Sequence, residues 1–275
     1  MRYQFRVSDI AKLGLTRLST AEARFADALS HPRSIALAGI VGLTALAWLA
    51  LGLMAAEPTA NVWQALCRPA PADGWTAALL AAPMWAAMAP AMMLPTAGPM
   101  ILTYAEIADT AARKGERVVS PLVLIAGYIV VWVGFACVAA ALQGLLGHAG
   151  LFAGGNAAPV LAGALAVGAG LYQFSALKQA CLTKCQRPFP FFFANWTTEA
   201  SGVLRLGLRQ GMTCLGCCWA VMTLMLAVGA MNVVWMAALG VVMTIEKMTS
   251  TATFSKALGV VFLAAGGGFL VLSVL

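Results

Sequence analysis

Long apolar stretches dominate the chain, and the charged residues fall mostly in the short segments between them. A helix needs ~20 apolar residues to cross a hydrocarbon core of ~30 Å. By that measure the sequence predicts about seven membrane-spanning helices, and hence an all-α fold, a polytopic transmembrane helical bundle. The predicted spans cover residues 34–54, 75–104, 121–146, 159–177, 202–228, 230–245 and 257–275.

Two predicted spans have unusual local sequences. Residues 202–228 and 230–245 have almost no loop between them, which predicts a tight hairpin around Gly229. The span 75–104 contains Pro83, Pro90, Pro95 and Pro99. Each proline removes a backbone donor and tends to kink a helix, so the freed carbonyls need other partners. We therefore expect this span to be bent, either as a packing helix or as a break that builds a site.

The division of the chain follows from where the apolar stretches begin. Residues 1–33 form a basic, cytoplasmic N-terminal segment, and residues 34–275 form a single transmembrane domain. Within the first segment, residues 8–29 mix apolar positions with Lys12, Arg17 and Arg24. This mixture fits an amphipathic helix on the inner leaflet, and it equally fits a loose basic tail that fixes topology.

Composition supports a membrane location. Hydrophobic residues make up 61% of the chain and charged residues only 10%, against ~25% charged in soluble domains. The net charge of +7 does not indicate nucleic-acid binding, because the basic residues flank apolar segments. Sixteen of the 17 lysines and arginines fall on one side of the predicted bundle, with Arg68 as the exception. The N-terminus is therefore predicted in the cytoplasm and the C-terminus outside.

Five of the seven cysteines form two groups near the predicted inner surface. Residues three and four apart share one helix face, so the C-x2-C-C run predicts a compact thiol patch in the span 202–228. The C-x3-C pair follows the neighbouring span, and the two groups can plausibly converge. Together these candidate metal ligands are Cys181, Cys185, Cys214, Cys217 and Cys218.

The predicted surroundings favour metal or redox chemistry at these thiols. Cytoplasmic thiols stay reduced, and soft thiolates select Cu(I), Zn(II) or iron–sulfur clusters. Arg205 and Arg209, with Lys184 and Arg187, would favour the thiolate form. The alternative is that the cysteines are small buried hydrophobic residues.

Other side chains give weaker signals. Met84, Met88 and Met92 recur every four residues and form one stripe of thioethers. Such a stripe is a Cu(I)-type pathway or simply core packing. Glu246 and Lys247 end a predicted span, so we expect them to reach the headgroups.

Several short motifs are spread along the chain: residues 91–96 with Pro99-Met100, Gly127-Tyr128 with Trp132, residues 170–173, residues 177–188, residues 211–219, Met231-Asn232 with Trp235-Met236, and Glu246-Lys247. With these motifs the chain resembles a bacterial family of predicted metal-binding integral membrane proteins, a domain of unknown function. The resemblance covers roughly residues 34–260 and implies metal binding at the same cysteines. Gln210 stands where family members often carry a histidine, and Ser175-Ala176 stands where a Thr-Pro pair is common.

The leading hypothesis is a multi-pass protein of the bacterial inner membrane that handles Cu(I) or Zn(II), for transport or delivery. Its expected partners are the lipid bilayer and a membrane or metal-receiving protein, and no nucleic acid. The P-loop, G-x-S-x-G and H-E-x-x-H signatures are missing. The sequence leaves enzymatic activity open and favours its absence. The alternatives are a non-catalytic accessory subunit of a larger membrane complex and a thiol–disulfide carrier.

Overall fold

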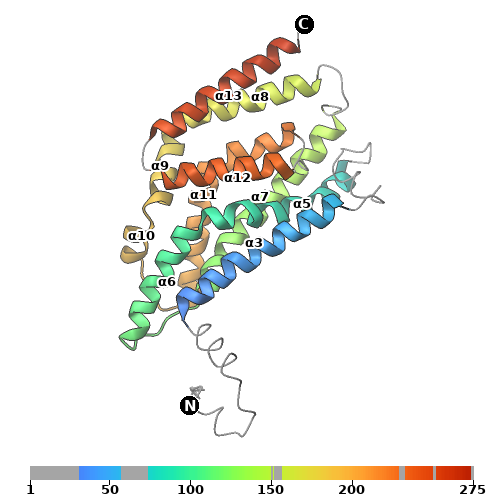
Figure 1. The fold of residues 1–275 in the computed structure, drawn as a ribbon. Helices are drawn as coiled ribbons and strands as arrows, with labels where there is room; N and C mark the ends of the chain where they lie inside the picture. Colours follow the sequence, from blue (N-terminus) through green and yellow to red (C-terminus); the bar gives the residue numbers. More distant parts are fainter. Residues whose placement is uncertain are drawn as a thin grey trace.

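The computed structural model describes residues 31–56, 74–149, 151, 157–228, 233–249 and 252–273. Every regular element in these ranges is a helix, which confirms the all-α class. In Figure 1 most helices run back and forth between the lower left and the upper right of the view. The described helices are α3 (Pro32–Ala56), α5 (Gly74–Thr96), α6 (Gly98–Arg113), α7 (Pro121–His148), α8 (Ala157–Gln173), α9 (Ala176–Gln186), α10 (Pro188–Ala194), α11 (Ala200–Val228), α12 (Val233–Met248) and α13 (Ala252–Leu272).

Each predicted span corresponds to one helix or to a bent pair of helices. Within the described residues, three helices are long and apolar enough to cross a membrane, and the number rises to five if each bent pair is one span. The three are α3, α7 and α13. Helix α12 has 16 residues, which is about 24 Å at ~1.5 Å per residue. The count of seven spans stays a prediction.

The proline-rich span is bent, as predicted. Helices α5 and α6 meet at Ala97 with a bend of 62°. Pro95 has no N–H to donate to the carbonyl of Ala91, and the indole Nε1 of Trp48 on α3 donates to that oxygen at 3.0 Å. A side chain on a neighbouring helix thus satisfies a backbone group that the proline leaves free.

A second bend separates α8 from α9. The two helices meet at 66°, where Phe174 and Ser175 join them. The Ser175 hydroxyl accepts a hydrogen bond from the backbone N–H of Lys178 at 3.1 Å and so caps α9. The bend directs α9, with Cys181 and Cys185, toward α11 rather than along the axis of α8 (Figure 1).

Glycines allow the closest helix contacts. Helices α7 and α11 cross at Gly127 and Gly207, where a Cβ on either residue would overlap the backbone of the other helix. Helices α8 and α13 lie side by side (Figure 1), and Gly163 and Gly266 meet between them in the same way. Small residues in these positions let the backbones approach.

Some predictions fall outside the described residues. These are the amphipathic segment 8–29, the hairpin around Gly229 and the position of Arg68 on the outer side.

Candidate metal centre

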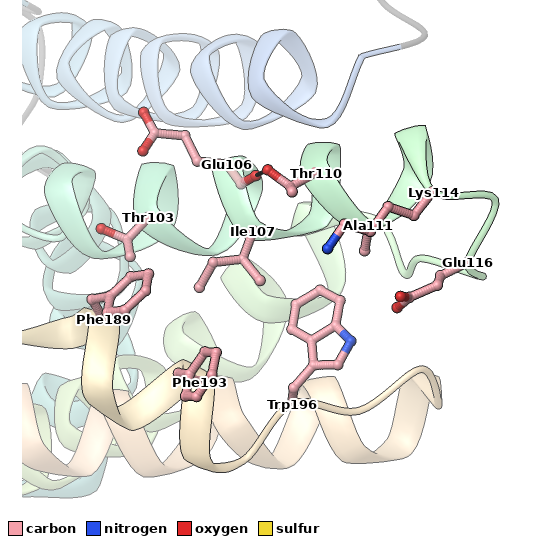
Figure 2. Close-up of a pocket in the computed structure, with 10 residues that line it drawn as sticks. All are labelled: Thr103, Glu106, Ile107, Thr110, Ala111, Lys114, Glu116, Phe189, Phe193 and Trp196. Atoms are coloured by element: carbon pink, nitrogen blue, oxygen red, sulfur yellow. Dashed lines mark hydrogen bonds between the residues drawn. The ribbon is translucent and has the colours of Figure 1, made fainter.

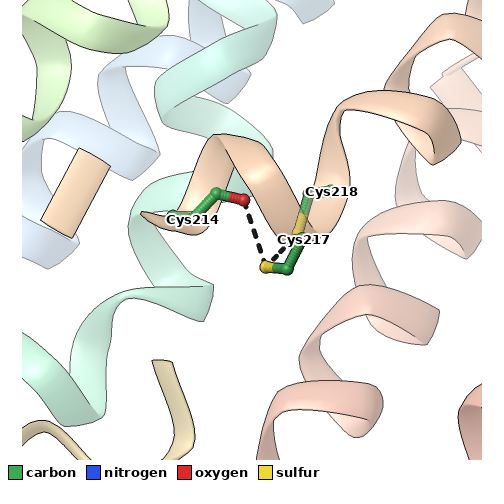
Figure 3. A group of neighbouring side chains, drawn as sticks. All are labelled: Cys214, Cys217 and Cys218. Atoms are coloured by element: carbon green, nitrogen blue, oxygen red, sulfur yellow. Dashed lines mark hydrogen bonds between the residues drawn. The ribbon is translucent and has the colours of Figure 1, made fainter. Parts of the chain in front are cut away.

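Three thiols form a compact group on one face of α11. The Sγ atoms of Cys214, Cys217 and Cys218 all lie within 4.8 Å of one another, and all three residues are buried (Figure 3). The Sγ atoms of Cys217 and Cys218 are 3.3 Å apart, and the Cys217 thiol donates to the carbonyl of Cys214 at 3.1 Å. The predicted thiol patch is therefore present, because residues three and four apart on a helix share a face.

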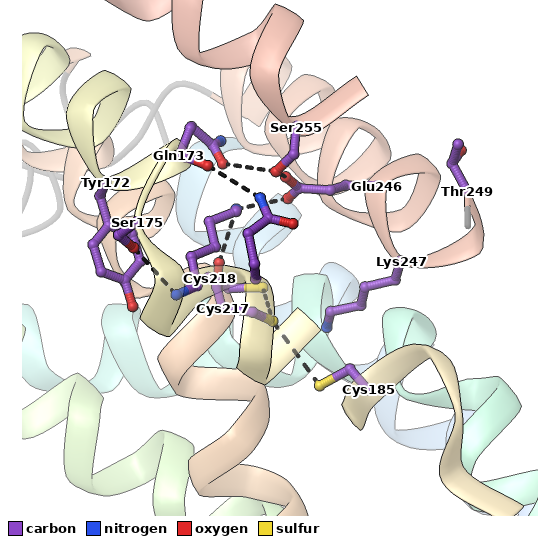
Figure 4. A network of polar contacts seen from close by, with 12 residues as sticks. Tyr172, Gln173, Ser175, Cys185, Cys217, Cys218, Glu246, Lys247, Thr249 and Ser255 are labelled. Atoms are coloured by element: carbon purple, nitrogen blue, oxygen red, sulfur yellow. Dashed lines mark hydrogen bonds and ion pairs between the residues drawn. The ribbon is translucent and has the colours of Figure 1, made fainter. Parts of the chain in front are cut away.

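The second pair of cysteines approaches this triad from α9. The Sγ of Cys185 lies 4.0 Å from the Sγ of Cys217 (Figure 4). Cys181, one turn earlier, packs its Sγ against Gly216, where a Cβ would lie 2.7 Å from the sulfur. The two cysteine groups thus converge, with Cys185 nearest to the triad and Cys181 against the backbone behind it.

The charged partner of the thiols is Lys247 on α12. Its ammonium Nζ lies 3.0 Å from the Sγ of Cys214 and donates to the Thr96 hydroxyl at 2.6 Å. The phenol oxygen of Tyr128 lies 3.0 Å from the same sulfur and donates to the Met93 carbonyl. Cys214 therefore has a cation beside it, which stabilises a thiolate, while the Tyr128 hydroxyl uses its one proton on the Met93 carbonyl.

Glu246 and Lys247 do not form the solvated helix end that we expected from the sequence, but have specific partners inside the protein. Glu246 is 3% exposed and forms an ion pair of 2.9 Å with Lys178, which is fully buried. Lys178 also donates to the carbonyl of Cys217 at 3.0 Å, and Ser255 donates to the other carboxylate oxygen of Glu246. Figure 4 shows the side chains of Glu246 and Lys247 leaving α12 in different directions, with Glu246 linked to Ser255.

The methionine stripe lies in the core. Met84, Met88 and Met92 are all buried on α5. The methionine that shares a cavity with the thiols is Met100, on α6. That cavity has a volume of about 20 Å³, enough for roughly one water molecule. Its lining residues are Thr96, Ala97, Met100, Tyr128, Cys185, Gln210, Cys214 and Lys247.

The arginines expected beside the thiols lie instead on an adjoining surface. Arg205 and Arg209 are exposed on α11. With Lys184 and Arg187 they line a cavity of about 770 Å³, which we call the basic cavity. The residue that lines both this cavity and the small thiol cavity is Gln210.

A third cavity, of about 620 Å³, lies between α6 and α10. Phe189, Phe193 and Trp196 line one wall, and Glu106 and Lys114 are among the residues of the other (Figure 2). None of its lining residues is a cysteine, so it is separate from the candidate metal centre.

Sequence reasoning missed Lys247, Tyr128 and Lys178 as parts of the site. Each has a functional partner far along the chain, and helical spacing gives no information about such contacts. One signal was available: ionisable residues next to apolar spans are costly to bury, so they tend to have a specific partner when buried.

A buried thiol cluster with a cation beside it is a site whose soft ligands suit a soft metal ion. A family model described as a copper chaperone, PpoB2, matches residues 82–269, which is more than half of the chain. The chain belongs to the PpoB2 copper chaperone family. The matched region contains all five clustered cysteines together with Lys178, Glu246 and Lys247. No curated protein and no solved structure matches the chain significantly.

Proposed function

We propose that this protein is a multi-pass copper chaperone of the bacterial inner membrane, which binds Cu(I) and delivers it to a receiving protein. The observation that carries the proposal is the buried triad Cys214, Cys217 and Cys218 with Lys247 beside it. Cys185 is proposed as a further ligand because of its contact with Cys217. Cys181 is proposed as an alternative thiol ligand that lies behind the triad.

The spacing of the sulfurs supports binding of one ion. Two thiolates that bind the same ion at ~2.3 Å are at most about 4.6 Å apart. The Cys217–Cys218 and Cys185–Cys217 separations of 3.3 and 4.0 Å are inside that limit. All three Sγ atoms of the triad lie within 4.8 Å of one another, a bound close to that limit.

The chemistry of the ligands favours Cu(I) over Zn(II). An all-sulfur site suits soft Cu(I), and Zn(II) in structural sites takes four tetrahedral ligands. Two or three thiolates around Cu(I) leave a net negative charge in a buried site. Lys247 partly offsets that charge, and burial of the ligands is then less costly.

The remaining parts of the proposal concern location and route. The distribution of lysine and arginine supports an N-terminus in the cytoplasm and seven spans. The buried stripe Met84, Met88 and Met92 is proposed as packing for the core, with Met100 as the thioether that can contact copper near the thiols. Arg205 and Arg209 are proposed to lie where copper enters the protein from the surface on its way to the thiols.

The test is metal analysis of protein purified in mild detergent under reducing, chelator-free conditions. We expect close to one copper per chain in the wild type and almost none in a Cys214→Ser/Cys217→Ser/Cys218→Ser variant. The matched control is Cys137→Ser, because Cys137 is an exposed thiol on α7, and it should keep its copper. A wild type that stays metal-free after incubation with Cu(I) would exclude the proposal.

The same preparations separate the proposal from its alternatives. A thiol–disulfide carrier would show a change in the number of alkylated cysteines between oxidised and reduced samples, with no bound metal. An accessory subunit would co-purify with other subunits at fixed stoichiometry, with or without its thiols.

A further inference from the structure

The basic cavity has an unusual balance of charge. Lys184 and Arg187 reach it from α9 and its C-terminal end, and Arg205 and Arg209 reach it from α11. No acidic side chain is among its lining residues, and within the described ranges none of the four cations is in an ion pair with a carboxylate. Four uncompensated cations around one cavity create a positive potential that attracts anions.

The size of the basic cavity fits a small molecule. Its volume of about 770 Å³ is within the range of ~300–1,000 Å³ that is typical of small-molecule sites. Its lysine and arginine side chains thus offer both charge and hydrogen-bond donors to a polar, anionic ligand.

The position of the basic cavity connects it to the thiols. Gln210 is 3% exposed and lines both the basic cavity and the small thiol cavity. Cys185 lines the thiol cavity, while its chain neighbours Lys184 and Arg187 line the basic one. The basic cavity therefore adjoins the thiol cavity at Gln210, and Cys185 on the thiol side contacts Cys217 at 4.0 Å.

We infer that the basic cavity binds a small anionic thiolate complex of Cu(I), from which the protein receives its copper. The inference rests on the proposed function and names the donor class for the same site. In a reducing compartment soft Cu(I) is held by thiols, and the abundant small thiol there is glutathione. Glutathione carries a net negative charge through its two carboxylates, which is the charge that the cavity attracts.

The transfer is a ligand exchange without electron transfer. A Cu–S bond to the donor thiolate breaks as a Cu–S bond to Cys185 forms, and copper remains Cu(I). The proton that the Cys185 thiol loses goes to the released donor thiolate. Further exchange with Cys217 then moves the ion into the triad.

The experiment compares two donors that share the same thiol and differ in whether their two carboxylates are free or esterified. Initial rates of copper transfer are measured anaerobically, by the ultraviolet absorption of Cu(I)–thiolate, from Cu(I)–glutathione and from Cu(I)–glutathione diethyl ester. We expect the wild type in neutral-lipid nanodiscs to take copper faster from the anionic donor, by at least ~10-fold at low salt. An Arg205→Gln/Arg209→Gln variant should bring the ratio of the two rates close to one.

The control removes the same number of charges elsewhere. Arg113→Gln/Arg117→Gln changes two exposed arginines outside the cavity, and the ratio of rates should stay at the wild-type value. A wild-type ratio of one, or a ratio that the Arg205→Gln/Arg209→Gln variant does not change, would overturn the inference alone. Loss of the ratio when phosphatidylglycerol is added would also overturn it and identify a lipid-headgroup site. A wild type that accepts copper from neither donor would overturn the proposed function as well.

Discussion

Lys247 and Glu246 are adjacent in the sequence and contact different groups. Successive residues of a helix point in different directions, so α12 can present one side chain to the thiols and the next to Lys178. Lys247 contacts Cys214, and Glu246 neutralises Lys178. One turn of α12 therefore supplies a cation to the thiols of the candidate metal centre and an anion to Lys178. Lys178 in turn donates a hydrogen bond to the carbonyl of Cys217.

The first prediction concerns Lys247. A Lys247→Met variant should bind Cu(I) at least about 10-fold more weakly, a loss of ~1.4 kcal/mol. The reason is that the excess negative charge of the copper–thiolate cluster would be buried without its cation. Competition with a chromogenic Cu(I) chelator measures this change. Lys256→Met, at an exposed position of α13, is the control, and equal affinities of the two variants would contradict the role of Lys247.

The two cysteines of α9 should differ in importance. Cys185 contacts the Sγ of Cys217, whereas Cys181 packs against Gly216. We expect Cys185→Ser to lower the copper affinity by about 10-fold or more and Cys181→Ser to have a smaller effect, in the same chelator competition. If Cys181→Ser proves to be the more harmful change, Cys185 is not the nearer ligand.

At the scale of residues, the sequence predicts which side chains meet on one helix, but it predicts few contacts between helices. Cys214, Cys217 and Cys218 share a face because of the helical period, so their grouping could be read from spacing. The partners of Cys214 could not, since Lys247 and Tyr128 lie on other helices and reach the sulfur only through tertiary packing. Spacing alone therefore assigns the positive charge to Arg205 and Arg209, which lie nearer in sequence.

At the scale of elements, the crossing of α7 and α11 holds the thiol-bearing helix in place. A Gly127→Ala change would push its new Cβ into the backbone oxygen of Leu204, and such overpacking typically costs ~1–3 kcal/mol. We expect a lower melting temperature in detergent and weaker copper retention. Gly134→Ala on the same helix has nothing within 4 Å of its Cβ, so it should melt close to the wild type. Equal melting of the two variants would argue against a tight crossing.

The buried ion pair between α9 and α12 gives a second prediction for elements. Glu246→Gln would leave Lys178 charged and buried without a counter-ion, which costs ~3–5 kcal/mol when one partner of a buried pair is removed. Thermal unfolding should show a large loss of stability, and Lys178→Met/Glu246→Leu should recover part of it. Asp109→Asn, which breaks the exposed pair with Arg113, should cost at most about 1 kcal/mol.

Local breaks were predictable for α5 and α6 and less so for α8 and α9. The four prolines predict the first bend. The hydrogen bond from Trp48 to Ala91 satisfies a carbonyl that Pro95 leaves free. The second bend depends on Ser175 as a helix cap, a common residue that gives a weak signal. The bend directs α9 toward α11 because of tertiary packing, and the spacing of residues in the sequence does not predict that packing.

At the scale of the whole molecule, the proposed topology places the two ends of α7 on opposite sides of the membrane. A single cysteine introduced at Leu151, after α7, should react with an impermeant maleimide added to intact spheroplasts. A cysteine introduced at Arg117, before α7, should react only after the membrane is opened, because the basic segments are retained inside. The reverse pattern would invert the proposed orientation.

The apolar pattern was sufficient to predict the helical class and the approximate position of every long helix. It did not determine which helices are neighbours, since apolar faces carry little information about their partner. The pairing of α8 with α13 became visible only through the contacts of Gly163 and Gly266. The convergence of the two cysteine groups depends on such pairings, so spacing alone could make it plausible and no more.

The bend before α9 has a consequence for the release of copper. Cys185 and the triad are on different helices, and the 66° turn at Phe174 and Ser175 makes α9 a separate arm. A small rotation of that arm would lengthen the 4.0 Å distance between Cys185 and Cys217 and withdraw one thiolate from a bound ion. Affinity falls as ligands are withdrawn, so a receiving protein that moves α9 would obtain the metal without having to compete with all the thiols at once.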